Sequence, residues 1–212
     1  MLAEIRTGIV RASDGTVNPA RAGRFGELIC GDTVGKYFEL AKQGQLFCAS
    51  MQGGTTLGTV LQNTAVTFTL YNPSASGVLV SLLECSISFT ALQVTTTTIE
   101  TLVYAANLNT AAAIPTATTA LTVRSALLGA GSGQAQAFSA ATLPATPVVI
   151  RVFPLNAFCT VTTQLAESSL SATDKIDGAI VLQPNTAVTI QELATTTSAS
   201  GIISMLWAEI PL

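Results

Sequence analysis

Apolar and polar residues alternate in a series of short runs from about Leu57 to the end of the sequence. An apolar residue at every second position is typical of a β-strand with one buried and one exposed face. The run at 64–73 has an apolar face and a polar face: Val66, Phe68 and Leu70 against Thr67, Thr69 and Tyr71. It ends at Asn-Pro followed by SASG, which is a typical turn sequence.

The next run, GVLVSLLECSISFTA at 77–91, predicts a long strand. Its apolar face is expected to hold Leu79, Leu83, Cys85, Ile87 and Phe89, opposite Glu84, Ser86 and Ser88. Further alternating runs follow at 98–107, 120–128, 134–141 and 146–154, separated by turn sequences such as GAGSG and QPN. About eight such strands predict an antiparallel sandwich or a closed barrel. No run shows a sustained helical period.

The closing stretch, IVLQPNTAVTIQELATTTSASGIISMLWAEIPL at 180–212, contains two alternating runs around a connector rich in Thr, Ser and Ala. We predict a closing hairpin in which Val188 and Ile190 pack inward. The single tryptophan, Trp207, shares a face with Ile203 and Met205. It is therefore predicted to be a core or subunit-interface residue.

The first 54 residues differ in composition from the rest. They are rich in glycine. The chain has nine basic and twelve acidic residues, and eleven of these charged residues lie within the first 42 positions. The piece VGKYFELAKQGQ at 34–45 fits either one or two helical turns ended by Gly44 or an extended backbone, and the pattern favours short strands and extended backbone. We predict an extended N-terminal arm at 1–54 and a β domain at 55–212.

Composition favours a protein that works in an assembly. Hydrophobic residues make up 49% of the chain and charged residues only 10%, against about 25% charged in ordinary soluble domains. Large interfaces have charge-depleted centres, so such a composition fits buried contacts. The longest apolar runs are far shorter than the roughly 20 residues of a membrane-spanning helix. The N-terminal residues do not form a secretory signal, which indicates synthesis in the cytoplasm.

The sequence excludes most enzyme chemistry. It has no histidine, the commonest general base and a frequent metal ligand. A carboxylate pair such as Glu84 with Glu192 could serve a glycosidase, but Glu84 is expected on a polar strand face. The GAGSG loop precedes a strand pattern, whereas a phosphate-binding loop precedes a helix. We predict no catalytic site and no cofactor.

Metal and nucleic-acid sites are also not predicted. Asp174, Asp177 and Asn185 could offer oxygen ligands to Ca²⁺, although their spacing matches no EF-hand loop. The four cysteines lie far apart, with no CxxC pair, so we expect buried free thiols. Residues 43–212 hold three basic residues against seven acidic ones, which makes nucleic acid a poor partner.

The arm carries the predicted partner-binding residues. Arg21 and Arg24 are the best basic pair in the chain, and arginine is favoured at protein interfaces. The predicted set comprises Arg21, Arg24, Phe25, Lys36, Tyr37 and Phe38. Removal of residues 1–52 is expected to leave a folded β domain that no longer binds its partner.

Three segments in order carry a resemblance to a known family: TAVTFTLYNPSASGVLVSLLECSISFTA, TIETLVYAANLN, and AIVLQPNTAVTIQELATTTSASGIISMLWAEIPL. The chain from Leu57 to Leu212 resembles the jelly-roll structural proteins of tailed bacteriophage particles, which decorate or cement the capsid or form head spikes. The resemblance implies an antiparallel jelly-roll sandwich, a homotrimer, and a place on the capsid exterior where major capsid proteins meet. It implies a mechanical role in resisting the pressure of packaged DNA.

Two other readings stay open. A receptor- or glycan-binding module of a head fibre or tail spike would use the same fold, but would need exposed aromatic residues. A jelly-roll capsid protein of another virus class is the other. An enzyme is disfavoured, because no acid–base pair is evident.

Overall fold

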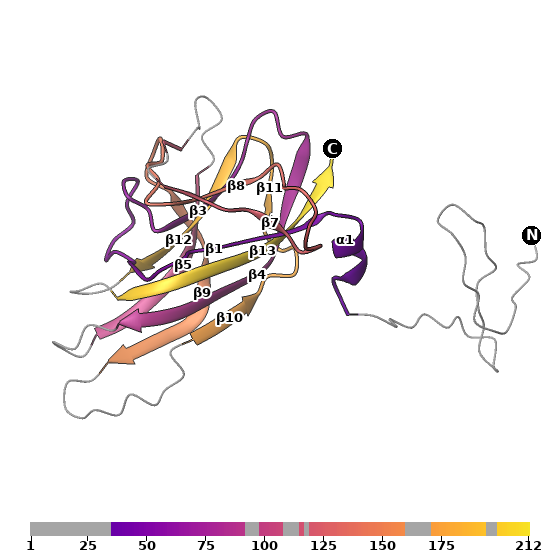
Figure 1. Cartoon of the computed structure of the whole chain (residues 1–212). Coiled ribbons are helices and arrows are strands. Elements are labelled where there is room, and N and C mark those ends of the chain that lie inside the picture. Colours follow the sequence, from indigo (N-terminus) through magenta and orange to yellow (C-terminus); the bar gives the residue numbers. More distant parts are fainter. Residues whose placement is uncertain (1–34, 92–97, 108–114, 117–118, 160–170, 194–198) are drawn as a thin grey trace, which may run out of the picture. The chain divides into compact units, whose positions relative to one another are not determined.

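A computed structural model describes residues 35–91, 98–107, 115–116, 119–159, 171–193 and 199–212 (Figure 1). The chain divides into two compact units, Met1–Phe38 and Glu39–Leu212. Of the first unit, only residues 35–38 are described. Apart from one short helix, the regular secondary structure described in the second unit is antiparallel β-sheet.

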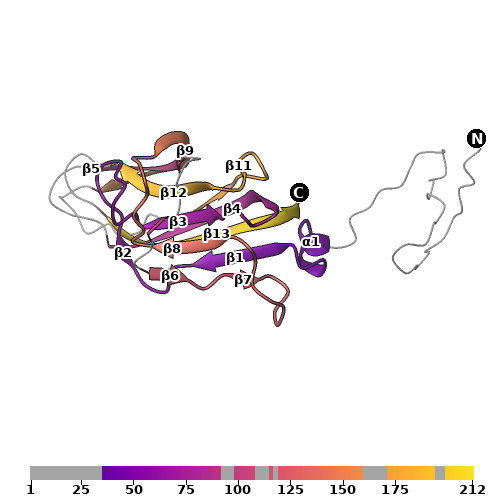
Figure 2. The same ribbon diagram turned by 90° about the horizontal axis from the view of Figure 1, so that it is seen from above.

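Two sheets form the second unit. The first has the order β10 (Ser171–Lys175), β4 (Val78–Ala91), β13 (Ser200–Pro211), β1 (Leu46–Ser50) and β7 (Arg124–Ser125), with β2 (Thr55–Thr56) on β13 and β11 (Val181–Leu182) on β4. The second has the order β6 (Thr119–Leu121), β8 (Gln136–Ser139), β3 (Phe68–Asn72), β12 (Thr186–Leu193), β5 (Thr98–Asn107) and β9 (Val148–Cys159). Figure 2 shows the two layers from above.

The strand order is that of a jelly roll. The eight principal strands, taken along the chain as B to I, are β1, β3, β4, β5, β9, β10, β12 and β13. The first sheet then contains B-I-D-G and the second C-H-E-F, which is the double Greek key of a jelly roll. The predicted all-β, antiparallel jelly-roll sandwich is therefore confirmed.

The core lies between the sheets. Its largest fully buried side chains include Trp207, Tyr104, Phe68 and Phe153. Burying side chains of this size contributes about 1.5–3 kcal/mol each. The predicted inward positions of Val188 and Ile190 are confirmed, since both belong to this core.

The prediction of which β4 side chains face the core is wrong for the first half of the strand. Val80 and Leu82 are fully buried in the core, whereas Leu79 and Leu83 are not part of it. The register against β13 shifts here, because Leu206 pairs with Glu84 but Trp207 pairs with Leu82. Leu83 is the extra residue of a β-bulge, which reverses the inward face along the strand. After it, Cys85, Ile87 and Phe89 point into the core as predicted.

The predicted face of the 64–73 run also changes at its start. Phe68 and Leu70 join the main core, but Val66 belongs to a second buried cluster with Tyr71, which was expected to be exposed. Val66 lies outside β3 and exchanges backbone hydrogen bonds with Ala141, and Ala65 just before it has a left-handed φ of 52°. The second cluster also contains Phe138, Ala141, Leu143 and Ala187.

The turn after β3 is confirmed, and Asn72 stabilises it. The Asn72 Nδ2 donates to the carbonyls of Val78, at 2.8 Å, and Leu182, at 3.0 Å. Gly77 has φ 67°, which glycine adopts without strain. The Asn-Pro-Ser-Ala-Ser-Gly sequence thus ties β3, β4 and β11 together at one end of the sandwich.

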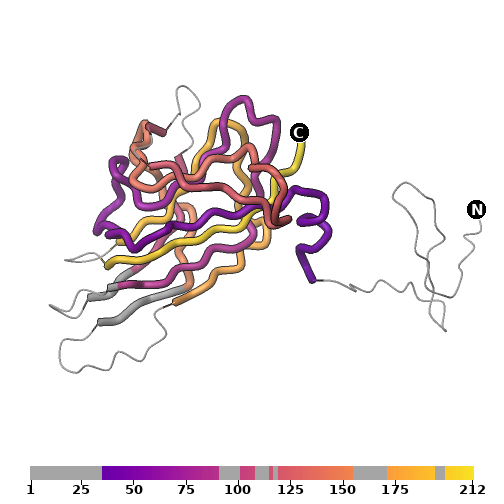
Figure 3. The backbone as a smooth tube through the Cα atoms, viewed as in Figure 1, coloured from indigo at the N-terminus to yellow at the C-terminus, as the bar shows by residue number. Residues whose placement is uncertain are grey.

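The prediction of a closing hairpin is wrong. β12 pairs with β3 and β5 in one sheet, whereas β13 lies between β4 and β1 in the other. The two closing strands therefore lie in opposite layers, as the tube in Figure 3 shows. Both strands are well formed, but each finds its partners far away in the sequence.

The β fold begins before the predicted boundary at residue 55. Residues Leu46–Ser50 form β1, which pairs with both β13 and β7, so removing residues 1–52 would take a strand out of the first sheet. The preferred extended backbone at 34–45 is also wrong. Residues Phe38–Lys42 form the short helix α1, and Gly44 follows it with φ 69°, a typical helix end. No described helix is long and apolar enough to cross a membrane.

Candidate assembly surfaces

The predicted arm residues fall into two groups. Arg21, Arg24 and Phe25 lie outside the described residues. In the described part of the arm, the Lys36 Nζ lies 5.1 Å from the centroid of the Tyr37 ring, a cation–π distance. Phe38 begins α1 and its side chain is about half exposed. The role of this set in partner binding stays a prediction.

Trp207 lies in the interior of the chain's own fold. Its side chain is fully buried, and its Nε1 donates a hydrogen bond to Glu209 Oε1 at 3.1 Å. A buried indole packs well and satisfies its single donor in this way. Trp207 is therefore unavailable as a stacking platform for a sugar ring.

Glu209 is a buried carboxylate that holds the loop before β8. Besides Trp207, its Oε1 accepts from the Ala135 backbone N–H at 3.0 Å, and its Oε2 accepts from the Gln134 N–H at 2.7 Å. A Cβ on Gly133 would overlap the carboxylate, so glycine is required there. The GAGSG sequence, predicted to be a turn before a strand, thus supplies the glycine that lets the loop close on Glu209.

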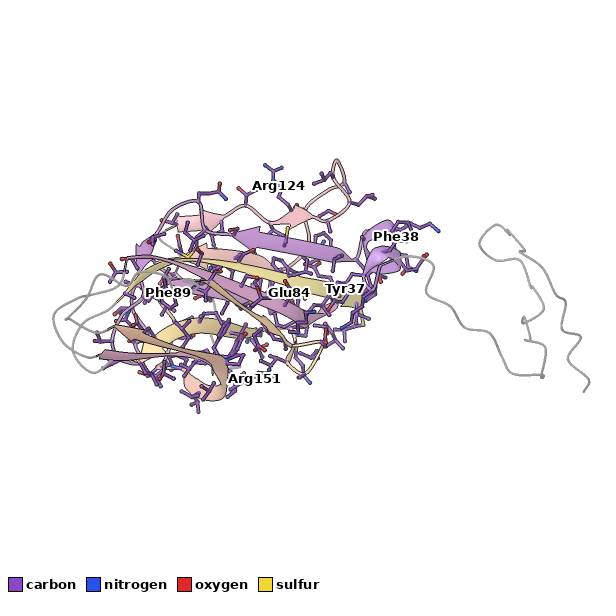
Figure 4. The ribbon with its side chains drawn as sticks, turned by 90° about the horizontal axis from the view of Figure 1, so that it is seen from below. Tyr37, Phe38, Glu84, Phe89, Arg124 and Arg151 are labelled. Atoms are coloured by element: carbon purple, nitrogen blue, oxygen red, sulfur yellow. The ribbon has the colours of Figure 1, made fainter. Side chains whose placement is uncertain are left out.

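The same loop carries the most exposed leucine of the described chain. Leu128 is 90% exposed and Leu127 is 46% exposed. They lie between β7 and β8, at the end of the first sheet where Arg124 is labelled in Figure 4. The sequence pattern had assigned both leucines to a strand, so it did not predict this tip.

A polar cluster joins the two sheets at their other side. The Asp174 carboxylate on β10 accepts a hydrogen bond from the Tyr104 hydroxyl on β5 and pairs with the Arg151 guanidinium on β9, both at 2.9 Å. Tyr104 also stacks on Phe153, with ring centroids 5.7 Å apart. A buried carboxylate with these two partners is satisfied, so this cluster locks β9 and β10 together.

Cys85 lies beside this cluster. Burial raises the pKa of the Cys85 thiol to about 12, opposed by a hydrogen bond with Tyr104 and reinforced by the negative charge of Asp174 and Glu84. Burial likewise raises the pKa of the Tyr104 hydroxyl. Cys85 and Cys48 are free thiols. A protonated, buried thiol is chemically inert, so Cys85 acts as a core residue.

The other residues considered for chemistry are separated or engaged. Glu84 is on β4 opposite Lys175, whereas Glu192 is buried on β12 in the other sheet and accepts from the Ala199 N–H. Asn185 Oδ1 accepts from the Tyr71 hydroxyl. Among the residues that the structure describes, no group of three or more His, Cys, Asp and Glu side chains could hold a metal ion.

An apolar row lies on the edge strand β9. Val148, Ile150 and Val152 are 69%, 47% and 55% exposed. Among the strands that the structure describes, β9 is the last of its sheet, so one side of its backbone has no described strand partner. Edge strands of isolated proteins usually carry charges that prevent association, whereas this strand exposes three apolar side chains. The register against β5 shifts at Ile150, so Val148 and Val152 point to opposite faces of the sheet, and the three residues line its edge rather than one face.

Comparisons with known proteins add little to this geometry. No family model matches the chain, and no curated protein matches it. A chain in the three-dimensional structure of Cocksfoot mottle virus is similar over 78% of this chain and 94% of that chain, at 14% sequence identity and a TM-score of 0.20. At that TM-score the likeness carries no argument, and the jelly-roll assignment rests on the strand order alone.

Proposed function

We propose that this chain is a non-enzymatic structural protein of a virus particle, and that it decorates or cements the outside of a tailed-phage head. The apolar row of Val148, Ile150 and Val152 on β9 carries the proposal, because it is a ready binding surface on a charge-poor chain. Jelly rolls of this strand order are common in viral capsid proteins. Fold by itself does not give function, so the proposal depends on this surface.

The proposed work is mechanical. Contact of the β9 row with a major capsid protein would remove apolar area from water, which favours association by about 25 cal/mol for each Å². A standard interface buries about 1,600 Å² in total. Many copies on one shell would add avidity, so each contact need only be modest. The arm residues Arg21, Arg24, Phe25, Lys36, Tyr37 and Phe38 would provide a second contact, and the working unit would be a homotrimer.

The alternatives share the fold but use other surfaces. A jelly-roll capsid protein would build the shell itself, and its copies would contact one another across the whole sandwich edge. A glycan-binding head fibre or tail spike would need an exposed platform of aromatic side chains. Trp207 is buried, and among the aromatic side chains that the structure describes Phe38 alone is about half exposed. The decoration role is therefore the function that the described surfaces support best.

Immunogold labelling tests the proposal. An antibody raised against the full chain is applied to virions purified from the natural host, and the labelled particles are imaged by electron microscopy. Gold on the outside of heads would support decoration, whereas gold on tails alone would favour the fibre reading. Particles that contain none of this chain by mass spectrometry would overturn a virion role.

The binding surface is tested separately. The variant Val148→Ser/Ile150→Ser/Val152→Ser is added to heads that lack this protein. We expect it to stay folded and to bind weakly, while the matched control Val181→Ser, at the exposed position of β11, binds like the wild type. Equal binding of both variants would remove the β9 row from the proposal.

A further inference from the structure

The chain between β2 and β3 contains a surface segment, residues 58–65, that is called the strap here (Figure 2). The structure describes all of these residues, and they form neither helix nor strand. None of their side chains is buried, whereas the flanking Leu57 is only 2% exposed and Val66 is fully buried. A segment that buries no apolar side chain adds little to the core, and such segments open at low free-energy cost.

The two ends of the strap are held together. Val66, at one end, exchanges backbone hydrogen bonds with Ala141. The hydroxyl of the next residue, Thr67, donates a shared hydrogen bond to the carbonyls of Thr56, at 3.1 Å, and Leu57, at 3.2 Å, which lie at the other end. The strap is therefore a loop on a closed base, in the manner of an Ω-loop. Its middle can move while its ends stay in place.

One side-chain amide holds the middle of the strap. The Gln62 N–H donates to Gln191 Oε1 at 2.9 Å, and Gln191 Nε2 donates to the Gln62 carbonyl at 3.0 Å. The amide thus pairs with the strap backbone as a neighbouring strand would. Gln191 is 2% exposed and follows Ile190, whose side chain lies in the core, so Gln191 points to the outer face of β12. Its Nε2 also donates to Thr189 Oγ1 at 3.2 Å, which fixes the orientation of the amide.

Little else keeps the strap closed. Within the described part of the chain, its other hydrogen bonds are those of Asn63, whose carbonyl accepts from the Leu143 N–H at 2.6 Å and whose Nδ2 lies 3.5 Å from the Leu143 carbonyl. Both ends of the strap have a left-handed backbone, with φ 95° at Gly58 and φ 52° at Ala65. Glycine adopts this conformation freely, but it strains alanine. Opening therefore releases strain at Ala65.

We propose that the strap is a conformational device, which opens as one unit about its two left-handed ends while both sheets stay folded. Gln191 is the lock that keeps it closed. Opening breaks the hydrogen bonds of Gln62 and Asn63 and exposes the buried Gln191 amide on the outer face of β12. The device does not involve the β9 row, so it goes beyond the proposed function and can fail or succeed independently of it.

Amide hydrogen exchange of the full chain, followed by NMR spectroscopy, tests the device through the Leu143 N–H, because the Asn63 carbonyl of the strap protects it. In the wild type this amide should exchange at least about 10-fold faster than the amides of the central strand β13. Its rate should also be insensitive to low urea concentrations, since opening the strap exposes little surface. The amides of β13 exchange through global unfolding, so their rates should rise steeply with urea.

Gln191→Ala tests the lock, since Gln191 makes no hydrogen bond to Leu143 itself. Loss of its two hydrogen bonds to the strap should speed exchange of the Leu143 N–H about 10- to 100-fold. The Val66 N–H, at the base, should exchange as in the wild type. The control Gln136→Ala, at an exposed position of β8, should change neither rate. Three results would overturn the proposal: a wild-type Leu143 rate that rises with urea in parallel with β13, a Leu143 rate that Gln191→Ala leaves unchanged, or an equal acceleration of the Leu143, Val66 and β13 amides in that variant.

Discussion

The Glu209 carboxylate makes a sharp prediction about stability. It accepts hydrogen bonds from the N–H groups of Gln134 and Ala135 and from the Trp207 indole. Glu209→Ala would leave the Ala135 and Trp207 donors buried without a partner, while Gln134 lies near the surface and can bind water. Each buried donor without a partner costs about 1–3 kcal/mol, so the two cost about 2–6 kcal/mol.

One further effect lowers the expected loss of stability. Removing the carboxylate also removes the cost of burying its charge, which favours the lower half, about 2–4 kcal/mol. This is a large part of the roughly 5–15 kcal/mol that stabilises a typical domain. Glu209→Gln keeps one acceptor oxygen but sets an amide NH₂ against the Gln134 N–H, so a smaller loss of about 1–2 kcal/mol is expected.

Urea unfolding followed by fluorescence measures these losses directly, because Trp207 is the only tryptophan and lies against the altered group. Glu84→Gln is the matched control, since Glu84 is a partly exposed carboxylate on the outer face of β4. It should change the free energy of unfolding by no more than about 0.5 kcal/mol. A Glu209→Ala protein that matches the wild type in stability and emission would refute the reasoning.

Three further predictions follow from the described contacts. Gly133→Ala should destabilise the fold by about 1–3 kcal/mol through overpacking, whereas Gly131→Ala, which has open space around it, should not; urea unfolding compares them. Because the folded state keeps the Cys85 proton up to about pH 12 and an ordinary thiol loses it near pH 9, stability should fall as pH rises through this window. In the Cys85→Ala variant, the free energy of unfolding should fall less between pH 8 and pH 10.5, as measured from unfolding curves at the two pH values. Deleting residues 1–34 should preserve cooperative unfolding, whereas deleting 1–52, which removes β1, should abolish it.

Local patterns predicted the fold class well because strands with one buried face repeat every second residue. The strands at 98–107 and 186–193 and the turn at Asn72 follow directly from such patterns. Pairing did not follow, because alternation within a strand does not tell which strand lies beside it. A hairpin between the closing strands is locally reasonable, yet each strand lies between two other strands in a separate layer.

The errors have identifiable causes. The bulge at Leu83 reverses the inward face, and only the Leu-Leu-Glu sequence, an apolar pair where alternation would place a polar residue, hints at it. β10 was not predicted, since its residues Ser171–Lys175 are mostly polar and its only buried side chain is an aspartate. The Glu209 anchor had a signal that could be recognised: a single acid beside a tryptophan in an apolar strand, with a glycine-rich loop elsewhere in the chain.

The central position of β13 has a consequence for synthesis of the protein on the ribosome. β13 lies between β4 and β1, so these two strands have no partner on that side until residues 200–211 have been made. Translation adds about 5–20 residues each second. The backbone N–H and C=O groups on one side of β1 and β4 therefore stay unpaired for seconds. The nascent chain is therefore most exposed to aggregation just before its last strand emerges, and chaperones that shield unpaired strands should raise its yield.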